Sequence, residues 1–148
     1  MPGYDVTAHS AAKPSVVFGL LADCTTWPTW SPIDTAEIVD GEEPEGVGTI
    51  RVFRTGRNVS RERIVEMAPD RHIGYVIESG ALLDYRGDIL LSRTVDGGTD
   101  IRWRATFRPK TPGTGWFWRL VLTNFMRRCA QGLAAHAESV ERTTRRTT

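Results

Sequence analysis

The sequence predicts an α+β domain in which a curved antiparallel sheet of about seven strands wraps around a long C-terminal helix. Residues 33–107 consist of short apolar runs separated by turn residues, which is typical of a meandering antiparallel sheet. Residues 116–142 contain no proline and carry an apolar stripe at helical spacing, which predicts one long helix. Such a stripe needs a comparably long apolar surface to cover it, and the concave face of the sheet supplies that surface.

Two short helices are expected after the first strand. Residues 4–12 alternate loosely and predict a strand, and Pro14 then opens a short amphipathic helix. The segment 25–32 holds two prolines within five residues, so it accommodates no more than one helical turn. Trp27 and Trp30 are expected to press this turn against the rest of the fold.

The strand at 101–108 shows the clearest alternation in the chain. Its apolar side chains fall on one face, and three arginines and a threonine fall on the other. A Gly-Gly connection at 97–98 joins it to the apolar run at 85–91, as expected for a hairpin. Gly and Pro at 41–46 predict a loop, and Pro and Asp at 68–71 predict a turn.

The chain is expected to form a single domain. Its 148 residues contain neither an internal repeat nor a linker, and this length is ordinary for one hydrophobic core. Apolar residues cease after Val140. The domain is therefore expected to span residues 1–141, followed by a polar C-terminal tail at 142–148.

Composition excludes several classes of protein. Hydrophobic residues make up 40% of the chain, which excludes intrinsic disorder. Nineteen Lys and Arg residues against eighteen Asp and Glu residues leave a net charge of +1, and this balance argues against a nucleic-acid partner. The sequence shows no secretory signal and no apolar run of the roughly 18 residues that a membrane span needs. We therefore expect a cytoplasmic protein without integral membrane association.

The residues that usually carry catalysis or bind metals form no recognised motif. Cys24 and Cys129 lie far apart and are expected to be reduced, partly buried thiols. His9, His72 and His136 are distributed over different elements and lack the spacing of a metal site. Phosphate-binding, dinucleotide-binding and serine-hydrolase motifs are missing from the sequence. No metal ion and no cofactor are expected.

A cavity is expected between the sheet and the last helix, because a straight helix and a strongly curved sheet do not fit together everywhere. Strand parity assigns the inward side chains of the sheet to its wall, and the helix stripe faces them. The predicted ligand-binding residues are Trp30, Ile73, Tyr75, Ile77, Tyr85, Ile89, Leu91, Trp103, Phe107, Phe125 and Cys129. This wall is mostly apolar with two phenol hydroxyls, which is the usual composition of a site for a lipophilic molecule.

Strand parity leaves the position of two glutamates open. Glu62 and Glu66 share the phase of Ile64, so an inward Ile64 places both carboxylates in the cavity, where desolvation raises their pKa and suits acid–base work. In the alternative, Arg61 and Arg63 occupy the inside of the sheet instead. Parity alone does not decide between these two arrangements.

Other polar residues are further candidates for a functional role. Tyr75 and Tyr85 join Glu62 as candidates for moving protons, although the sequence does not establish catalysis. An inward Arg51 would anchor a carboxylate or an enolate, but an outward Arg51 is favoured because an unpaired buried charge costs several kcal/mol.

The last helix also carries a group of basic residues. Contact of Arg119, Arg127 and Arg128 with an acidic partner or a membrane surface is disfavoured, because the apolar stripe of this helix is expected to be buried already.

Five segments resemble one superfamily: 27–32 (Trp-Pro-Thr-Trp-Ser-Pro), 46–49, 62–71, 97–99 and 109–116. The chain is similar to the SRPBCC superfamily of START-like helix-grip domains over nearly its whole length. The Trp-x-x-Trp-Ser-Pro piece and the later Glu-x-x-Pro-x-Arg piece resemble its bacterial polyketide cyclase/dehydrase-like branch. This resemblance implies the helix-grip fold and a pocket, but it names no substrate, because the superfamily holds carriers, sensors and enzymes on one scaffold.

The leading functional hypothesis is a domain that binds a small hydrophobic molecule, similar to a lipid, a polyketide or an aromatic compound, in the internal cavity. Burying each methylene contributes about 0.8 kcal/mol, so such binding needs few polar contacts. One alternative is a polyketide cyclase or dehydratase-like enzyme, in which the pocket folds a flexible chain into a reactive geometry. A second alternative is an interaction module with a filled core and no ligand. A monomer or a homodimer is compatible with the sequence.

Overall fold

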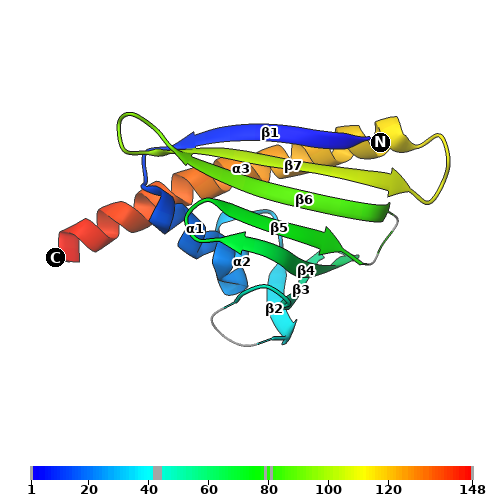
Figure 1. Cartoon of the computed structure of the whole chain (residues 1–148), viewed down its shortest axis with the longest axis horizontal. Helices are drawn as coiled ribbons and strands as arrows, with labels where there is room; N and C mark the ends of the chain where they lie inside the picture. The colour runs from blue at the N-terminus through cyan, green and yellow to red at the C-terminus, as the bar shows by residue number, and fades with distance from the viewer. Residues whose placement is uncertain (1, 42–44, 79, 81, 148) are drawn as a thin grey trace.

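The computed structural model describes residues 2–41, 45–78, 80 and 82–147 (Figure 1). Strand β1 (Gly3–Ser10) is followed by helix α1 (Pro14–Ala22), a 3-10 turn η1 (Cys24–Thr26) and the short helix α2 (Trp27–Trp30). The remaining strands are β2 (Thr35–Asp40), β3 (Ile50–Thr55), β4 (Asn58–Ala68), β5 (His72–Ile77), β6 (Leu82–Arg93) and β7 (Thr99–Pro109). Helix α3 (Gly115–Thr147) ends the chain. The predicted fold class and order of elements are confirmed, while residues 42–44 of the expected loop at 41–46 lie outside the described residues.

All seven strands form one antiparallel sheet in the order β1-β7-β6-β5-β4-β3-β2. The first strand pairs with the last, with Val6 opposite Trp103, so β1 and β2 are the two edges. Helix α3 runs along the β1 and β7 side of the sheet, and α1 and α2 pack against it (Figure 1). One face of the sheet is thereby covered by helices.

Strand β7 shows why the inner face of the sheet is dry. Its apolar residues Ile101, Trp103, Ala105 and Phe107 are buried, and the polar residues between them are exposed. Successive side chains of a strand point to opposite faces, so this alternation places one row in the core and one in solvent. The predicted orientation of this strand is confirmed.

Helix α3 contributes a buried row of Met126, Cys129, Leu133 and Ala137 to the core. Gly132 lies beside this row because a side chain there would place a Cβ 1.8 Å from the carbonyl oxygen of Trp30. The absence of a side chain at this position therefore lets α3 pack directly on the backbone of α2.

The C-terminal part of α3 extends further than the sequence predicts. The helix continues to Thr147, through most of the segment expected as a polar tail, and residues 142–145 are exposed. Arginine is a good helix former, and an ion pair joins Arg145 to Glu141 one turn earlier. In the described part of the chain, no helix is long and apolar enough to cross a membrane.

Candidate functional site

All three tyrosines of the chain meet in one buried cluster on the inner face of the sheet. The hydroxyl of Tyr4 lies 2.6 Å from that of Tyr85 and 3.3 Å from that of Tyr75. The indole Nε1 of Trp103 donates to the hydroxyl of Tyr75 at 2.8 Å. Strands β1, β5, β6 and β7 therefore each contribute one polar side-chain atom to this cluster inside the apolar core.

Small residues on the neighbouring strands make room for these rings. The row across the sheet that contains Tyr75 continues through Gly87 and Ala105 to Tyr4. A Cβ on Gly87 would lie 2.2 Å from the ring of Tyr75, so the ring occupies the space that a side chain would take. This local arrangement positions the Tyr75 hydroxyl between Tyr4 and Trp103.

A second buried polar group lies on β3 and β4. Arg51 is fully buried and pairs in register with Glu62, to which its Nε donates at 3.1 Å. Its Nη1 donates to Glu45 at 3.2 Å and to the carbonyl oxygen of Leu21 at 2.8 Å. The second carboxylate oxygen of Glu45 accepts from the backbone N–H of Cys24 at 2.9 Å. The group therefore ties α1 and η1 to the sheet.

Burial changes the protonation chemistry of both groups. Desolvation raises the pKa of Tyr4, Tyr75 and Tyr85, so all three phenols stay neutral at physiological pH. Desolvation also raises the pKa of Glu62, and the opposing effect of Arg51 is smaller. The pKa of Arg51 itself is raised, because Glu62 and Glu45 together outweigh the desolvation that lowers it. The three neutral phenols are therefore available as hydrogen-bonding groups.

The structure corrects the favoured outward position of Arg51. The argument against burial assumed an unpaired charge, but two carboxylates face the guanidinium. Glu62 lies inside as one alternative allowed, whereas Arg61 is exposed. Considering Arg51 and Glu62 together would have identified this pair, because each one supplies the partner that the other needs.

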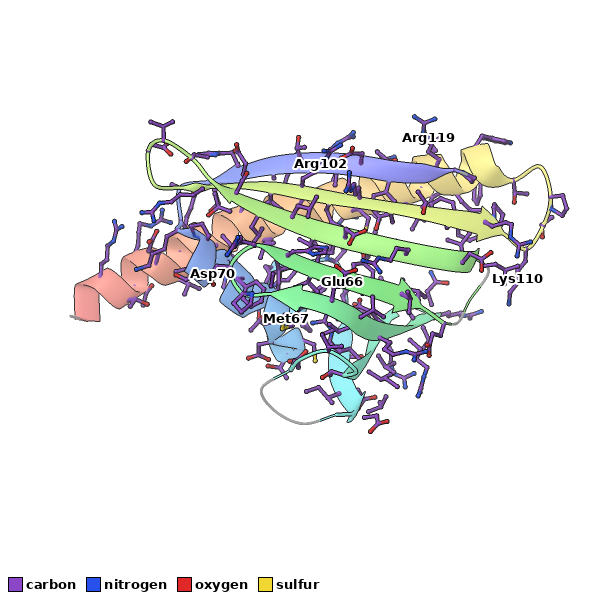
Figure 2. All side chains as sticks on the ribbon, viewed as in Figure 1. Glu66, Met67, Asp70, Arg102, Lys110 and Arg119 are labelled. Carbon is purple, nitrogen blue, oxygen red and sulfur yellow. The ribbon has the colours of Figure 1, made fainter. Side chains whose placement is uncertain are left out.

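Glu66 does not share the inner position of Glu62. The register between β4 and β5 shifts between Ile64 and Glu66, so the parity reverses at this bulge. Glu66 instead lies on the outer face, where it pairs with Arg86 and His72 (Figure 2). A bulge of this kind has no clear signal in the alternation of a single strand.

The predicted ligand-binding residues are largely brought together. Trp30, Ile73, Tyr75, Tyr85, Ile89, Leu91, Trp103, Phe107 and Cys129 are buried, and Ile77 and Phe125 are partly buried against the same core. Their rings contact one another: Tyr85 stacks on Phe107 with centroids 5.8 Å apart, and Trp27 meets Trp103 edge-on at 5.5 Å. The side chains expected to line a cavity are therefore packed against each other.

An open groove of about 940 Å³ lies beside β1, between the first half of α3 and outward-facing residues of β6 and β7 that include Arg86, Asp88 and Arg104. Gly3, Tyr4 and Ala105 line it from the sheet, and Trp116 and Leu120 line it from the helix. Tyr4 belongs both to this groove and to the tyrosine cluster. The other members of the cluster, Tyr75, Tyr85 and Trp103, do not line this groove.

Sequence reasoning missed Tyr4 and Glu45. Both lie outside the strands that were analysed for parity: Tyr4 comes from the loosely alternating first strand, and Glu45 comes from a segment interpreted as a loop. Among the described residues, no group of three or more His, Cys, Asp and Glu side chains is arranged to hold a metal ion. Both cysteines are free and buried.

Several solved structures share the fold of this protein. A START superfamily protein from Mycobacterium smegmatis superposes with a TM-score of 0.81 at 14% identity, covering 95% of this chain and 99% of that one. The protein XoxI from Bacillus cereus gives a TM-score of 0.79 at 16% identity, with coverages of 95% and 99%. A Thermobifida fusca protein gives 0.73 at 20% identity, with coverages of 90% and 93%. The fold is thus that of a START-like helix-grip domain.

The family follows from a match between the sequence and a family model. Residues 1–138 match the model described as polyketide cyclase/dehydrase and lipid transport. The chain belongs to this family. No curated protein matches the sequence.

Proposed function

We propose that this protein binds a small, mainly hydrophobic molecule between the sheet and α3, next to the tyrosine cluster. The observation that carries the proposal is that all three tyrosines of the chain, with Trp103, gather their polar atoms inside an apolar interior. A few convergent polar groups in an apolar wall are the usual means of orienting a lipophilic ligand. Family membership supports the same class of function.

The groove beside Tyr4 is the proposed route of entry. Tyr4 forms part of its lining, and the Tyr4 hydroxyl lies within hydrogen-bonding distance of the hydroxyls of Tyr75 and Tyr85. Because the aromatic side chains are in contact, a ligand enters only if the side chain of Tyr4 and the neighbouring part of α3 move away from the other rings of the core. The neutral phenols then offer hydrogen bonds to a carbonyl or hydroxyl group of the ligand. We place this activity in the cytoplasm, in a monomer or homodimer.

Cyclase- or dehydratase-like proton transfer is the second candidate. It is favoured by one observation, the raised pKa of the buried Glu62 carboxyl, whose charge also acts on Tyr75. Against it stand the raised pKa values of the phenols and the pairing of Glu62 with Arg51, which both reduce proton exchange. Ligand binding without turnover is therefore the better-supported function.

Native mass spectrometry of the purified protein, followed by titration with long-chain fatty acids and aromatic polyketides, tests the proposal. We expect a retained small-molecule adduct, or a ligand that raises the melting temperature in proportion to the logarithm of its concentration. Tyr85→Phe should weaken a carbonyl-bearing ligand about fivefold, which corresponds to about 1 kcal/mol for one lost hydrogen bond, and Thr7→Val serves as the exposed control on β1.

Other outcomes separate the alternatives. Unchanged affinity with lost turnover in Tyr85→Phe would favour the enzyme. If neither an adduct nor a thermal shift is found for any of these ligands, the protein is better described as an interaction module with a filled core.

A further inference from the structure

The first two turns of α3 expose a continuous apolar surface. Trp116 is 71% exposed, Phe117 45%, Leu120 61% and Val121 42%. We call these four residues the α3 patch. Trp116 and Leu120 are one turn apart, as are Phe117 and Val121, so the patch occupies one broad face of the helix. A surface of this kind on a small domain marks an interaction site more often than isolated exposed residues do.

The opposite face of the same turns is already in use. Trp118, Leu122 and Phe125 are partly buried against the core. The helix is therefore apolar on its inner and its outer side in these turns. The inner side alone packs on the core, so the fold does not need the apolar residues of the outer side. Sequence reasoning expected the apolar residues of α3 to be covered, but nothing in the described part of the chain covers the α3 patch.

The charged residues that flank the patch in the sequence have a single sign. Between Asp100 and Glu138 the sequence contains seven charged residues, and all are basic. Arg102 and Arg108 are paired with carboxylates of neighbouring strands. Lys110, Arg119, Arg127 and Arg128 are exposed, and they make no ion pair within the described residues.

Two of these cations, Arg119 and Lys110, lie at the same end of the molecule as the α3 patch (Figure 2). Figure 2 shows Arg119 pointing away from the sheet at the start of α3, with Lys110 on the preceding loop. Arg119 and Arg127 also line the groove beside β1, together with Trp116 and Leu120. Apolar and basic side chains are therefore interleaved on one surface.

We propose that the α3 patch and its basic surround dock this protein on an anionic phospholipid surface. Trp, Phe and Leu insert into the boundary between head groups and acyl chains, and Lys and Arg attract the anionic head groups. A second copy fits less well, because a symmetric contact through the patch would bring Arg119 close to its own counterpart. This inference does not depend on the proposed interior ligand site.

Co-sedimentation with vesicles tests the inference. Vesicles of phosphatidylglycerol and phosphatidylcholine in equal parts should bind the protein, and vesicles of phosphatidylcholine alone should bind it much less. Arg119→Gln should weaken binding about fivefold, the change expected from about 1 kcal/mol per basic residue near an anionic surface. The double variant Trp116→Ser with Leu120→Ser should weaken it by more than about tenfold.

Two controls use exposed residues away from the patch. Arg142→Gln changes a basic residue near the other end of α3, and Val95→Ser changes an exposed valine in the β6–β7 turn; neither should alter binding. Because the altered side chains are exposed, thermal unfolding should show that all variants are folded.

Three results would overturn the inference. These are equal binding to both kinds of vesicle, no binding to either, or loss of binding in the controls as large as in the patch variants. A dimer in light scattering that the double patch variant dissociates would instead assign the patch to a second copy. Failure of vesicle binding leaves the interior site untouched, since free ligands test that site without any membrane.

Discussion

Arg51 on β3 and Glu62 on β4 form an ion pair in which both side chains are almost completely removed from solvent. Glu45 completes the pair from the segment before β3. Breaking a buried ion pair costs far more than breaking an exposed one, because the remaining partner keeps its charge without compensation. The same strand carries an exposed pair, Arg54 with Glu37, which provides an internal reference.

Arg51→Leu should therefore lower the free energy of unfolding by about 3–5 kcal/mol. Arg54→Leu should lower it by no more than about 1 kcal/mol, because its pair is exposed. Urea unfolding followed by circular dichroism measures both. Equal losses of the free energy of unfolding in the two variants would show that breaking the buried pair costs no more than breaking the exposed one.

The contact between Gly132 and the Trp30 carbonyl makes a second prediction. Gly132→Ala should destabilise the protein, because the added methyl would lie 1.8 Å from that oxygen and α3 would have to move. Gly19→Ala in α1 has nothing within 4 Å and should stabilise by up to about 1 kcal/mol through helix propensity. Thermal melts of the two variants should move in opposite directions. A stabilised Gly132→Ala protein would contradict the close packing of α3 on α2.

Both thiols should be unreactive in the folded protein. Burial raises the pKa of Cys24 to about 12 and that of Cys129 to about 12, so almost no thiolate exists at neutral pH. An aromatic disulfide reagent that releases a coloured thiolate should detect no thiol in the native state. It should detect both thiols after unfolding in urea. Rapid labelling of either cysteine without denaturant would contradict this prediction.

The ion pair between Asp5 and Arg102 should make a small part of the stability dependent on pH. The hydrogen bond from Arg102 lowers the pKa of Asp5 below its ordinary value of 3.8. A lowered carboxyl pKa stabilises the fold above that ordinary value, and this contribution is lost as the pH falls through the lowered pKa.

Asp5→Asn should thus unfold at lower urea concentration than the unmodified protein at neutral pH, and the difference should vanish in strong acid. Arg102→Gln should give the same loss, and the double variant should lose no more than either single one. Additive losses would show that the two residues act independently.

Regular elements were predictable from the sequence where the physical signal is local. The inner face of β7 follows from strict alternation of Ile101, Trp103, Ala105 and Phe107 with polar residues, and the presence of one long helix at 116–142 follows from an uninterrupted stripe. Helix α3 extends beyond the predicted end near residue 142, because a helix does not have to end where its apolar residues end. Residues with good helix propensity can continue a helix in solvent.

The candidate site was harder to predict because it depends on partners from distant strands. Tyr75 and Tyr85 were selected by parity, but their partner Tyr4 lies on the opposite end of the chain. Arg51 was misplaced because a single strand does not show which charges lie opposite it. The reversal at Glu66 needs knowledge of the β4–β5 register, and register is a property of two strands together.

The pairing of β1 with β7 has a consequence for synthesis of the chain. Asp5 and Arg102 are 97 residues apart, yet they are neighbours in the sheet. During translation the first strand has no partner until nearly the entire sheet has left the ribosome, and the apolar face stays open until α3 follows. Long-range pairing of this kind slows folding and prolongs exposure of aggregation-prone edges. The edge of β7 that β1 occupies therefore completes the sheet only at the end of synthesis.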